Sequence, residues 1–285
     1  MPAGNSTFGD ISSLVAGIYE GTLFTLTNQA RLLPTVRLYQ DAVGYAPRTL
    51  GEYTPANVRT VAEGEDVTPT AFNKTSLATI TPMLRADNYL ITDARMSSDP
   101  DNVMRDASEQ LGGAFADNID TDIVALFASL TGGTVGTAGN PLTWAMISNA
   151  SAILSARKAM GRVFCVLHPY QWADLVASAT STGHAIANAV NVYNELDGVY
   201  FMSGVVANTT FVVTPAITVD VNDDATGAMY VGSAIGVDMR QGFVLRADRD
   251  ESRFSTELNA SMVYGVGAIR PLLGIKIISD ATLPA

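Results

Sequence analysis

Cysteine and histidine are scarce in this sequence, and their scarcity excludes several kinds of site. Cys165 is the only cysteine, so the chain can form neither an internal disulfide framework nor a cysteine-rich metal centre. His168 and His184 are the only histidines, and they lack the partners that a histidine-based zinc site requires. The glycines of TGGTVGTAGNP do not form a phosphate loop, because no strand leads into them and no lysine follows. We therefore expect no metal and no cofactor.

Basic residues are also scarce in this chain. Lys and Arg number 17 against 28 Asp and Glu, which gives a formal net charge of −11 at pH 7. Proteins that bind nucleic acid directly usually present a basic face to its phosphates. The composition thus disfavours direct or sequence-specific binding of nucleic acid.

Long apolar runs are missing as well. No stretch of about eighteen apolar residues is present, and the N-terminus lacks a basic region followed by an apolar one. We expect neither a membrane span nor a secretory signal, and synthesis in the cytoplasm. With 285 residues and 47% hydrophobic content, the chain can still bury the core of one large domain or two modest ones.

The most strongly patterned stretch is residues 99–133, DPDNVMRDASEQLGGAFADNIDTDIVALFASLTGG. Asp99 and Pro100 are typical of a helix start, and Gly132–Gly133 of a helix end. Between them, apolar residues recur at spacings of three and four, as expected of one helical face: Met104, Ala107, Leu111, Phe115, Ile119, Ile123, Leu126 and Leu130. The pattern predicts a helix of about 45–50 Å, with the acidic residues of DNIDTD on its polar face. These are Asp117, Asp120 and Asp122, for which we expect solvation or ion pairing between subunits.

The residues before this helix divide into two parts. Residues 1–35 predict a helix that ends before Pro34, and residues 36–96 contain frequent turn signals. The arms VRTVAEGEDVTPTAF and LATITPMLRADNYLITDA predict an extended hairpin with a charged tip at Glu63, Glu65 and Asp66. A long hairpin without a compact apolar face is unstable alone in water, so it requires a partner surface.

After the helix and a glycine-rich linker, the pattern predicts a small α/β domain. Thr143 is a good cap for a helix over 144–160, and Pro169 opens a second helix. Short strands are expected at 163–167, 199–202, 211–214 and 229–231. The last part, 242–279, alternates as long antiparallel strands do, and we expect these strands to form a sheet for the long helix to lie across.

This order of parts resembles the major capsid proteins of tailed double-stranded DNA bacteriophages, which share the HK97 fold. The resemblance rests on EGEDVTPTAF leading into ITPMLRADNYLITDA, on LGGAFADNIDTDIVALF, and on STELNASMVYGVGAIRPLLGIKI. It implies an α+β fold with an N-terminal arm, an extended E-loop hairpin, a spine helix on an antiparallel P-domain sheet, and an α/β A-domain. The implied divisions are 1–50 (N-terminal arm), 51–97 (E-loop), 98–140 (spine helix and linker), 141–241 (A-domain) and 242–285 (P-domain strands and C-terminus).

The resemblance also implies a structural, non-enzymatic protein. Its partners would be its own copies in hexamers and pentamers, which form an icosahedral virion capsid around packaged double-stranded DNA after synthesis in the cytoplasm of a bacterial host. About fifty residues precede the expected E-loop, fewer than the scaffolding region that some members carry, so we expect a separate scaffolding protein. The resemblance also implies a portal and leaves open whether a decoration protein binds the shell. Two alternatives remain: an encapsulin-type shell, and an α/β enzyme, which would require a pocket with converging polar groups.

Seven charged residues are candidates for contacts between subunits. Arg85, Arg95 and Arg105 lie near the base of the expected loop and the start of the spine, where they could pair with acidic groups of a neighbour. The other four lie in the loop itself: Glu63, Glu65, Asp66 and Lys74. Lys74 is an E-loop lysine, as in the isopeptide crosslink of the family prototype, but no matching asparagine can be assigned, and a solvated or ion-paired side chain is the expectation.

Two further clusters have a structural interpretation. Cys165, His168 and Asp174 lie close together along the chain, as the groups of a cysteine nucleophile could. However, the cysteine is inside the apolar strand VFCVL, and the histidine precedes a helix start, where it is expected to cap the helix rather than catalyse a reaction. The acidic stretch from Asp220 to Asp224 begins like a calcium loop but has Ala225 where glycine is required. We expect a turn there.

Overall fold

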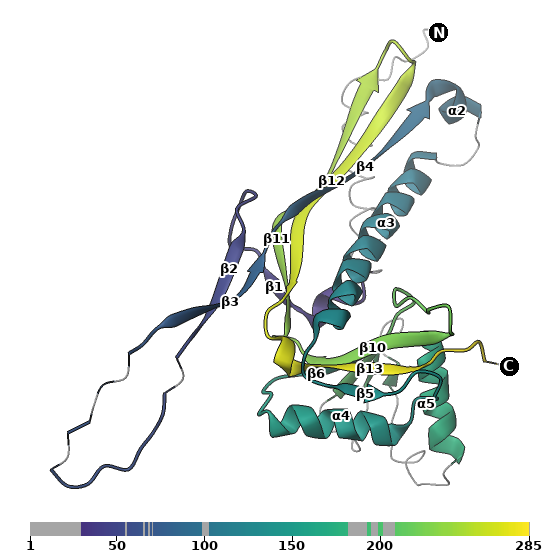
Figure 1. Cartoon of the computed structure of the whole chain (residues 1–285). Helices are drawn as coiled ribbons and strands as arrows, with labels where there is room; N and C mark the ends of the chain where they lie inside the picture. The colour runs from purple at the N-terminus through teal and green to yellow at the C-terminus, as the bar shows by residue number, and fades with distance from the viewer. Residues whose placement is uncertain are drawn as a thin grey trace, which may run out of the picture.

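The computed structural model describes residues 30–54, 56–64, 66–67, 69, 71–98, 103–181, 193–194, 199–201 and 209–284. Figure 1 shows an elongated upper part in which a helix runs beside a sheet, a more compact lower part built on a second sheet, and a hairpin that projects to one side. The helix predicted within residues 1–35 lies outside the described residues apart from its last few positions. None of the helices in these ranges is both long enough and apolar enough to cross a membrane.

The upper part is organised by the long helix α3 (Val103–Ala125), which a 3₁₀ turn extends over Leu126–Ser129. Its 23 residues correspond to a rod of about 35 Å. The predicted apolar stripe is confirmed from Leu111 onward at the buried residues Leu111, Phe115, Ile119, Ile123 and Leu130. Near its end the buried residue is Phe127 and not the predicted Leu126, which is only partly buried, because a 3₁₀ turn replaces the α-helix there. The stripe packs on the sheet beside it, and the rings of Phe115 and Phe243 meet edge to face with 5.3 Å between centroids.

The sheet beside α3 has four strands. In spatial order they are β1 (Arg37–Tyr39), β11 (Ile235–Asp250), β12 (Ser255–Ala268) and β4 (Met83–Thr92). β11 and β12 form a long antiparallel hairpin, with register shifts between Met239 and Val244. β1 joins β11 in parallel and β4 joins β12 antiparallel. The two long strands that the sequence predicts near the C-terminus therefore do form a sheet against the helix.

The lower part is built on a seven-stranded sheet. One of its strands, residues 274–280, was predicted to lie beside the long helix instead. Its strands, in order, are β5 (Thr134–Gly136), β13 (Gly274–Asp280), β10 (Asp224–Val231), β6 (Val163–Leu167), β9 (Thr209–Val213), β8 (Val199–Phe201) and β7 (Tyr193–Asn194). β13 was expected to lie under the long helix with β11 and β12. It instead pairs antiparallel with β10 and parallel with β5, which itself comes from the glycine-rich linker.

Two helices cover one face of this sheet. α4 (Trp144–Ala156) and α5 (Pro169–Ser181) pack on it with Ile147, Leu154 and Leu175 fully or almost fully buried (Figure 1). The other face meets the end of the spine, where Phe127 lies 5.8 Å from the ring of Tyr230. The core is thus continuous from the spine helix into the lower sheet.

The projecting hairpin is built from β2 (Arg48–Tyr53) and β3 (Lys74–Ile80), which pair antiparallel up to Tyr53 opposite Lys74. The sequence predicted arms at 58–72 and 77–94, but the first of these is the irregular tip, and the second divides between β3 and β4. The interruption falls at Thr81–Pro82, between the two strands, and β4 then joins the four-stranded sheet. Proline lacks the N–H that a continuing ladder would use.

Candidate assembly surfaces

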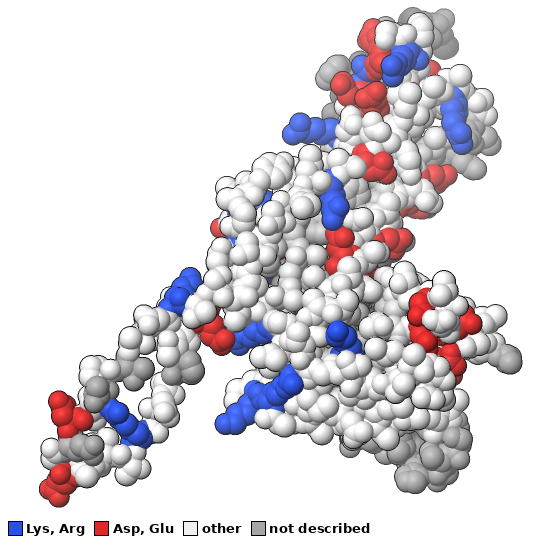
Figure 2. Space-filling view, viewed as in Figure 1, with Lys and Arg blue, Asp and Glu red and all other residues white. Residues whose placement is uncertain are grey.

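The hairpin tip carries the acidic candidates, and its described residues are largely exposed. Glu63 and Asp66 are exposed there, whereas Glu65 lies outside the described residues. Figure 2 shows acidic side chains at the far end of the hairpin, well away from both sheets. Apolar side chains are exposed on the same loop, with Val58 at 95% and Phe72 at 74% of their full area. Exposed apolar residues on a projecting loop are typical of a contact with another molecule.

Ring stacking stabilises the point where the tip begins. Tyr53 and Phe72 stack with 4.6 Å between ring centroids, and the Lys74 ammonium lies 6.0 Å from the Tyr53 ring. Lys74 is therefore placed at the start of β3 beside an aromatic ring rather than at the tip with Glu63 and Asp66. An ion pair of 3.0 Å between Arg270 and Glu52 ties β2 to the turn before β13.

A buried cluster of charges anchors the hairpin to the sheet. The Asp238 carboxylate on β11 is fully buried and pairs with Arg240 at 2.8 Å and with Arg48, at the start of β2, at 3.2 Å. Arg240 also donates to the backbone carbonyls of Val43 and Ala46, in the segment that leads into β2. Asp41 accepts from Arg48 on the outer side, and this hydrogen bond lowers the pKa of the Asp41 carboxyl. No motif in the sequence indicated this cluster, because Arg48 and Asp238 are 190 residues apart.

Arg85, predicted to contact a neighbouring subunit, has a partner within its own chain. Its guanidinium donates to the Asp122 carboxylate at 2.8 Å and lies 5.8 Å from the Tyr264 ring. The Tyr264 hydroxyl donates to the same carboxylate at 2.8 Å and lies 2.7 Å from the Asn118 side-chain oxygen. Burial, followed by the effect of the Asp122 carboxylate, raises the pKa of Tyr264. This network joins β4, β12 and the polar edge of α3.

The Arg85 network predicts a modest effect on stability. Arg85→Ala should lower the free energy of unfolding by about 1 kcal/mol, because the ion pair is partly exposed and Tyr264 continues to donate to Asp122. Arg95→Ala is a matched control, since the described residues give Arg95 no ion-pair partner, and it should change stability by less than about 0.5 kcal/mol. Urea unfolding of both variants measures the difference. Equal losses would show that the Arg85 network contributes nothing.

The remaining arginine candidates lie at the far end of the upper part. Arg95 is on the short helix α2 (Asp93–Ser98), and Arg105 is in the first turns of α3, where it pairs with Glu109 at 2.9 Å. α2 is held by an ion pair between Asp93 and Arg249 of β11. Of the six candidates that the structure describes, three lie on the hairpin and three lie on β4, α2 and α3, and these six do not converge on one site.

The sequence pattern predicted that Asp120 lies on the solvated face of the helix, and this prediction is wrong. The Asp120 side chain is buried, and its two carboxylate oxygens accept the backbone N–H groups of Arg31 and Leu32, each at 3.1 Å. Burial raises its pKa from 3.8 to about 6, more than the two N–H groups lower it. This carboxylate therefore fastens the end of the N-terminal arm to the spine helix. Asp117 is exposed and Asp122 is partly exposed, as expected.

The raised pKa of Asp120 gives a pH dependence with a definite sign. Below pH 3.8 the carboxyl is protonated in both states; between 3.8 and about 6 only the folded state retains the proton, so stability falls as pH rises. Relative to Asp120→Asn, which stays neutral, the wild type should lose on the order of 2 kcal/mol between pH 4 and pH 7.5. Urea unfolding of both proteins at the two pH values measures this. Parallel pH profiles would contradict the assignment.

The cysteine and histidine that lie close in sequence have structural roles. Cys165 is fully buried in β6, and burial raises the pKa of its thiol, which disfavours the reactive thiolate. His168 Nδ1 accepts the backbone N–H of Tyr170 at the start of α5, so the predicted capping role is confirmed. The acidic turn is confirmed too, because Asp220 accepts the N–H groups of Asn222 and Asp224. Among the described residues, no group of three or more acidic, histidine or cysteine side chains is placed to hold a metal.

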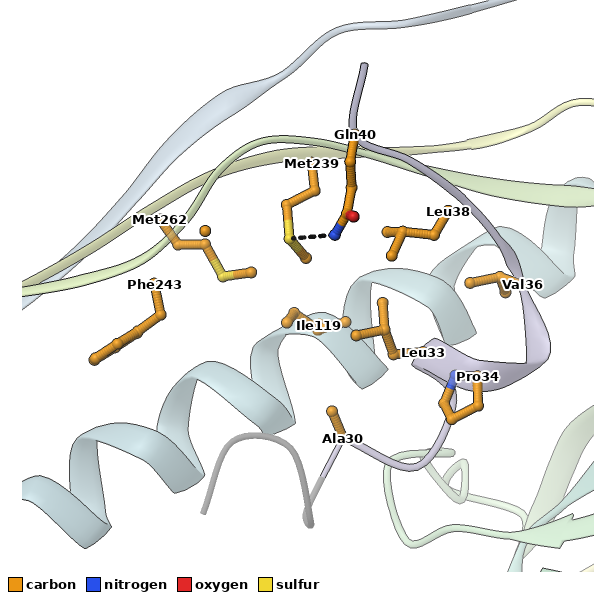
Figure 3. A pocket seen from close by; sticks show the side chains of 11 residues that line it. Ala30, Leu33, Pro34, Val36, Leu38, Gln40, Ile119, Met239, Phe243 and Met262 are labelled. Carbon is orange, nitrogen blue, oxygen red and sulfur yellow. Dashed lines mark hydrogen bonds between the residues drawn. The ribbon is translucent and has the colours of Figure 1, made fainter. Parts of the chain in front are cut away.

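A groove of about 490 Å³ lies between the N-terminal arm, α3 and the four-stranded sheet (Figure 3). Its walls are apolar apart from Gln40, whose amide donates to the sulfur of Met239 at 3.7 Å. Leu33 from the N-terminal arm and Ile119 from α3 lie next to each other in it (Figure 3). An enzyme active site generally combines an apolar pocket with several converging polar groups. This groove has no such convergence, so it does not support the enzyme alternative.

The projecting hairpin, the spine on its sheet and the second, helix-covered sheet define the class of HK97-like shell proteins. The phage capsid protein family model matches residues 78–277, and the chain belongs to this family. It is a structural, non-enzymatic capsid shell protein, located in the virion capsid. A comparison with curated proteins finds no match.

Solved capsids have the same fold at low sequence identity. The chain from the capsid of Ralstonia phage GP4 is 12% identical with a TM-score of 0.70, over 88% of each chain. The chain from the capsid of cyanophage P-SCSP1u is 17% identical with a TM-score of 0.63, over 87% of each. The chain from the head of Helicobacter pylori bacteriophage KHP40 is 13% identical with a TM-score of 0.65, over 87% of this chain and 89% of that one. At these identities the comparisons establish the fold.

Proposed function

We propose that this chain is the major capsid protein of a tailed phage and assembles as hexamers and pentamers into an icosahedral shell around packaged double-stranded DNA. The observation that carries the proposal is the hairpin tip, residues 54–73, which exposes apolar and acidic side chains beyond the two sheets. An isolated extended loop of this kind gains little from its own chain. A neighbouring copy would supply the surface that it needs.

The divisions of the chain follow from that proposal. Residues 1–50 would serve as the N-terminal arm, 51–97 as the E-loop, 98–140 as spine and linker, 141–241 as the A-domain, and 242–285 as P-domain strands and C-terminus. Because β13 pairs within the lower sheet, we assign residues 274–280 to the A-domain and not to the P-domain. β5 supports the same change for residues 134–136.

The charged candidates would act between copies from the exposed parts of these elements. Glu63, Glu65 and Asp66 would meet basic groups of a neighbour at the hairpin tip. Along the spine, Arg95 is better placed for this role than Arg85, whose guanidinium is already paired with Asp122. Arg105 would have to exchange Glu109 for a partner on another copy, and Lys74 would remain beside Tyr53.

Other partners are proposed from the family resemblance and from charge. A separate scaffolding protein and a portal would direct closure of the shell in the cytoplasm of the host, and a decoration protein is compatible with the exposed surfaces. The net charge of −11 suits an inner wall that encloses DNA without retaining it electrostatically. No sequence-specific DNA contact is proposed.

Expression of the chain alone, and together with the products of neighbouring genes, tests the proposal by size-exclusion chromatography and negative-stain microscopy. Closed polyhedral particles or sheets of hexamers are the expected result. Particles that contain DNA support the phage capsid, whereas particles that enclose a protein cargo would indicate an encapsulin-type compartment. A monomer or dimer under all these conditions would contradict the proposal.

A further inference from the structure

The seven-stranded domain has opposite charges at its two ends. One end, which we call the basic end, comprises the turn after α4, with the exposed residues Arg157, Lys158, Met160 and Arg162. The other, the acidic end, comprises the turn before β10 and the end of β13, with Asp220, Val221, Asp223 and Asp280. Figure 2 shows acidic side chains gathered at one side of the lower part and basic side chains at the other.

The strand β10 places these ends at a fixed separation. Its first residue, Asp224, pairs with Asp280, and its last residue, Val231, pairs with Val163, which follows Arg162. Seven steps of about 3.4 Å separate the two ends by roughly 24 Å. They are therefore different surfaces of one rigid sheet, too far apart to pair with each other within a subunit.

The acidic end is well ordered by its own hydrogen bonds. Asp220 accepts two backbone N–H groups within the turn, and Asp223 adopts a left-handed conformation with φ of 60°. The Asp280 carboxylate is close enough to Asp174 to contribute, after burial, to the raised pKa of the Asp174 carboxyl. Negative charge is thus concentrated here in a defined geometry.

The basic end is ordered in the same way. α4 ends at Ala156, the Arg157 guanidinium donates to the carbonyl of Leu272, and Lys158 adopts a left-handed conformation with φ of 55°. Between α4 and α5, Arg157, Lys158 and Arg162 are the only charged residues in the sequence. The end therefore presents positive charge without a neighbouring carboxylate in that stretch.

Each end also exposes one large apolar side chain among its charges. Met160 has 86% of its area exposed at the basic end, and Val221 has 99% exposed at the acidic end. A central apolar contact with a polar rim is the usual anatomy of a protein interface. The two ends are thus complementary in charge and similar in composition.

The basic end lies on the same side of the subunit as the hairpin. Arg157 contacts the turn that contains Leu272, and the neighbouring Arg270 pairs with Glu52, near the outer end of β2 in the hairpin. Figure 1 shows the hairpin leaving on the side of the short turn before β13. A neighbour that receives the hairpin would therefore lie next to the basic end.

We propose that the basic end of one copy binds the acidic end of the next copy, so that the seven-stranded domains associate head to tail around each capsomer. The inference rests on the proposed shell function and specifies the partner and polarity of one contact. Because the two surfaces differ, the contact is heterologous, and repetition with a suitable rotation closes a ring. Oriented opposite charges also favour this approach between copies that each carry a net charge of −11.

A charge exchange tests the contact. Lys158→Glu and Asp223→Lys alter exposed side chains, so each variant should remain folded; Asp223→Lys should unfold at a slightly lower urea concentration, because the left-handed conformation of Asp223 suits aspartate better than lysine. Each should raise the protein concentration needed for assembly about tenfold at low salt, and less at 0.5 M salt. The double variant should recover most of the loss. Glu251→Lys, on the turn between β11 and β12, is the matched control and should assemble normally.

A carbodiimide crosslink tests the same contact in the wild-type protein. Lys158 is one of only three lysines, so a bond to Asp220, Asp223 or Asp280 between isotope-labelled and unlabelled chains would identify the contact by mass spectrometry. The inference would be overturned, and the shell function left intact, if the wild type forms particles and the single variants assemble equally well. The same conclusion would follow if Lys158 in wild-type particles crosslinks to other carboxylates of a neighbour. Absence of wild-type particles would instead contradict the shell function.

Discussion

Replacing Asp238 with alanine should lower the free energy of unfolding by about 3–5 kcal/mol. The carboxylate is fully buried between Arg48 and Arg240, and both guanidinium groups are largely excluded from water. Removing it leaves Arg240 without its carboxylate partner and Arg48 with only the exposed Asp41, which costs more than the ion pairs themselves contribute. Urea unfolding measures the loss, and the hairpin should become more susceptible to proteolysis because Arg48 begins β2.

Asp41→Ala is the matched control for this experiment. Asp41 pairs with the same Arg48, but 71% of its side chain is exposed, so water replaces the lost partner. The expected loss is below about 1 kcal/mol. Similar losses for the two variants would show that the buried position of Asp238 is unimportant for stability.

Deleting the hairpin tip should abolish assembly while leaving the subunit folded. Tyr53 and Lys74 are directly opposite, so residues 54–73 can be replaced by Asn-Gly, which forms a two-residue hairpin turn. The tip packs little against the rest of the chain, and thermal unfolding should shift by only a few degrees. Negative-stain microscopy should show no shells, because the apolar and acidic surface offered to a neighbour is gone.

A second variant separates the reach of the loop from its apolar contacts. Val58→Ser and Phe72→Ser together retain the full length of the loop, and they should weaken assembly less than the deletion does. Normal shells from the deletion variant would contradict the role proposed for the hairpin. A large loss of thermal stability in that variant would instead show that the tip supports its own subunit.

Elements that depend on local pattern could be predicted from the sequence. The buried stripe of α3 follows from residues three and four apart, and β6 has the predicted bounds because its apolar run stands between Gly161 and Pro169. The capping role of His168 likewise depends on a residue two positions away. In each case the deciding interactions lie within a few residues along the chain, so spacing is sufficient evidence.

Parts of the candidate surfaces could not be predicted, because their partners are distant in sequence. Arg85 could be recognised as a charged residue near the loop base, but Asp122 lies on α3 and is brought beside it only by the packing of α3 on the sheet that contains β4. Asp238 and Arg48 meet only because β1 and the following turn lie along β11. No spacing rule connects such pairs.

The sequence by itself determined the long amphipathic helix and the order of hairpin, spine and α/β segment, because these depend on composition and short-range period. Only the tertiary structure decided that β13 joins the lower sheet, that Asp120 holds the N-terminal arm, and that opposite charges occupy the two ends of β10. Those outcomes depend on which strand edges and faces meet, and strand pairing is set by contacts between residues far apart in the chain.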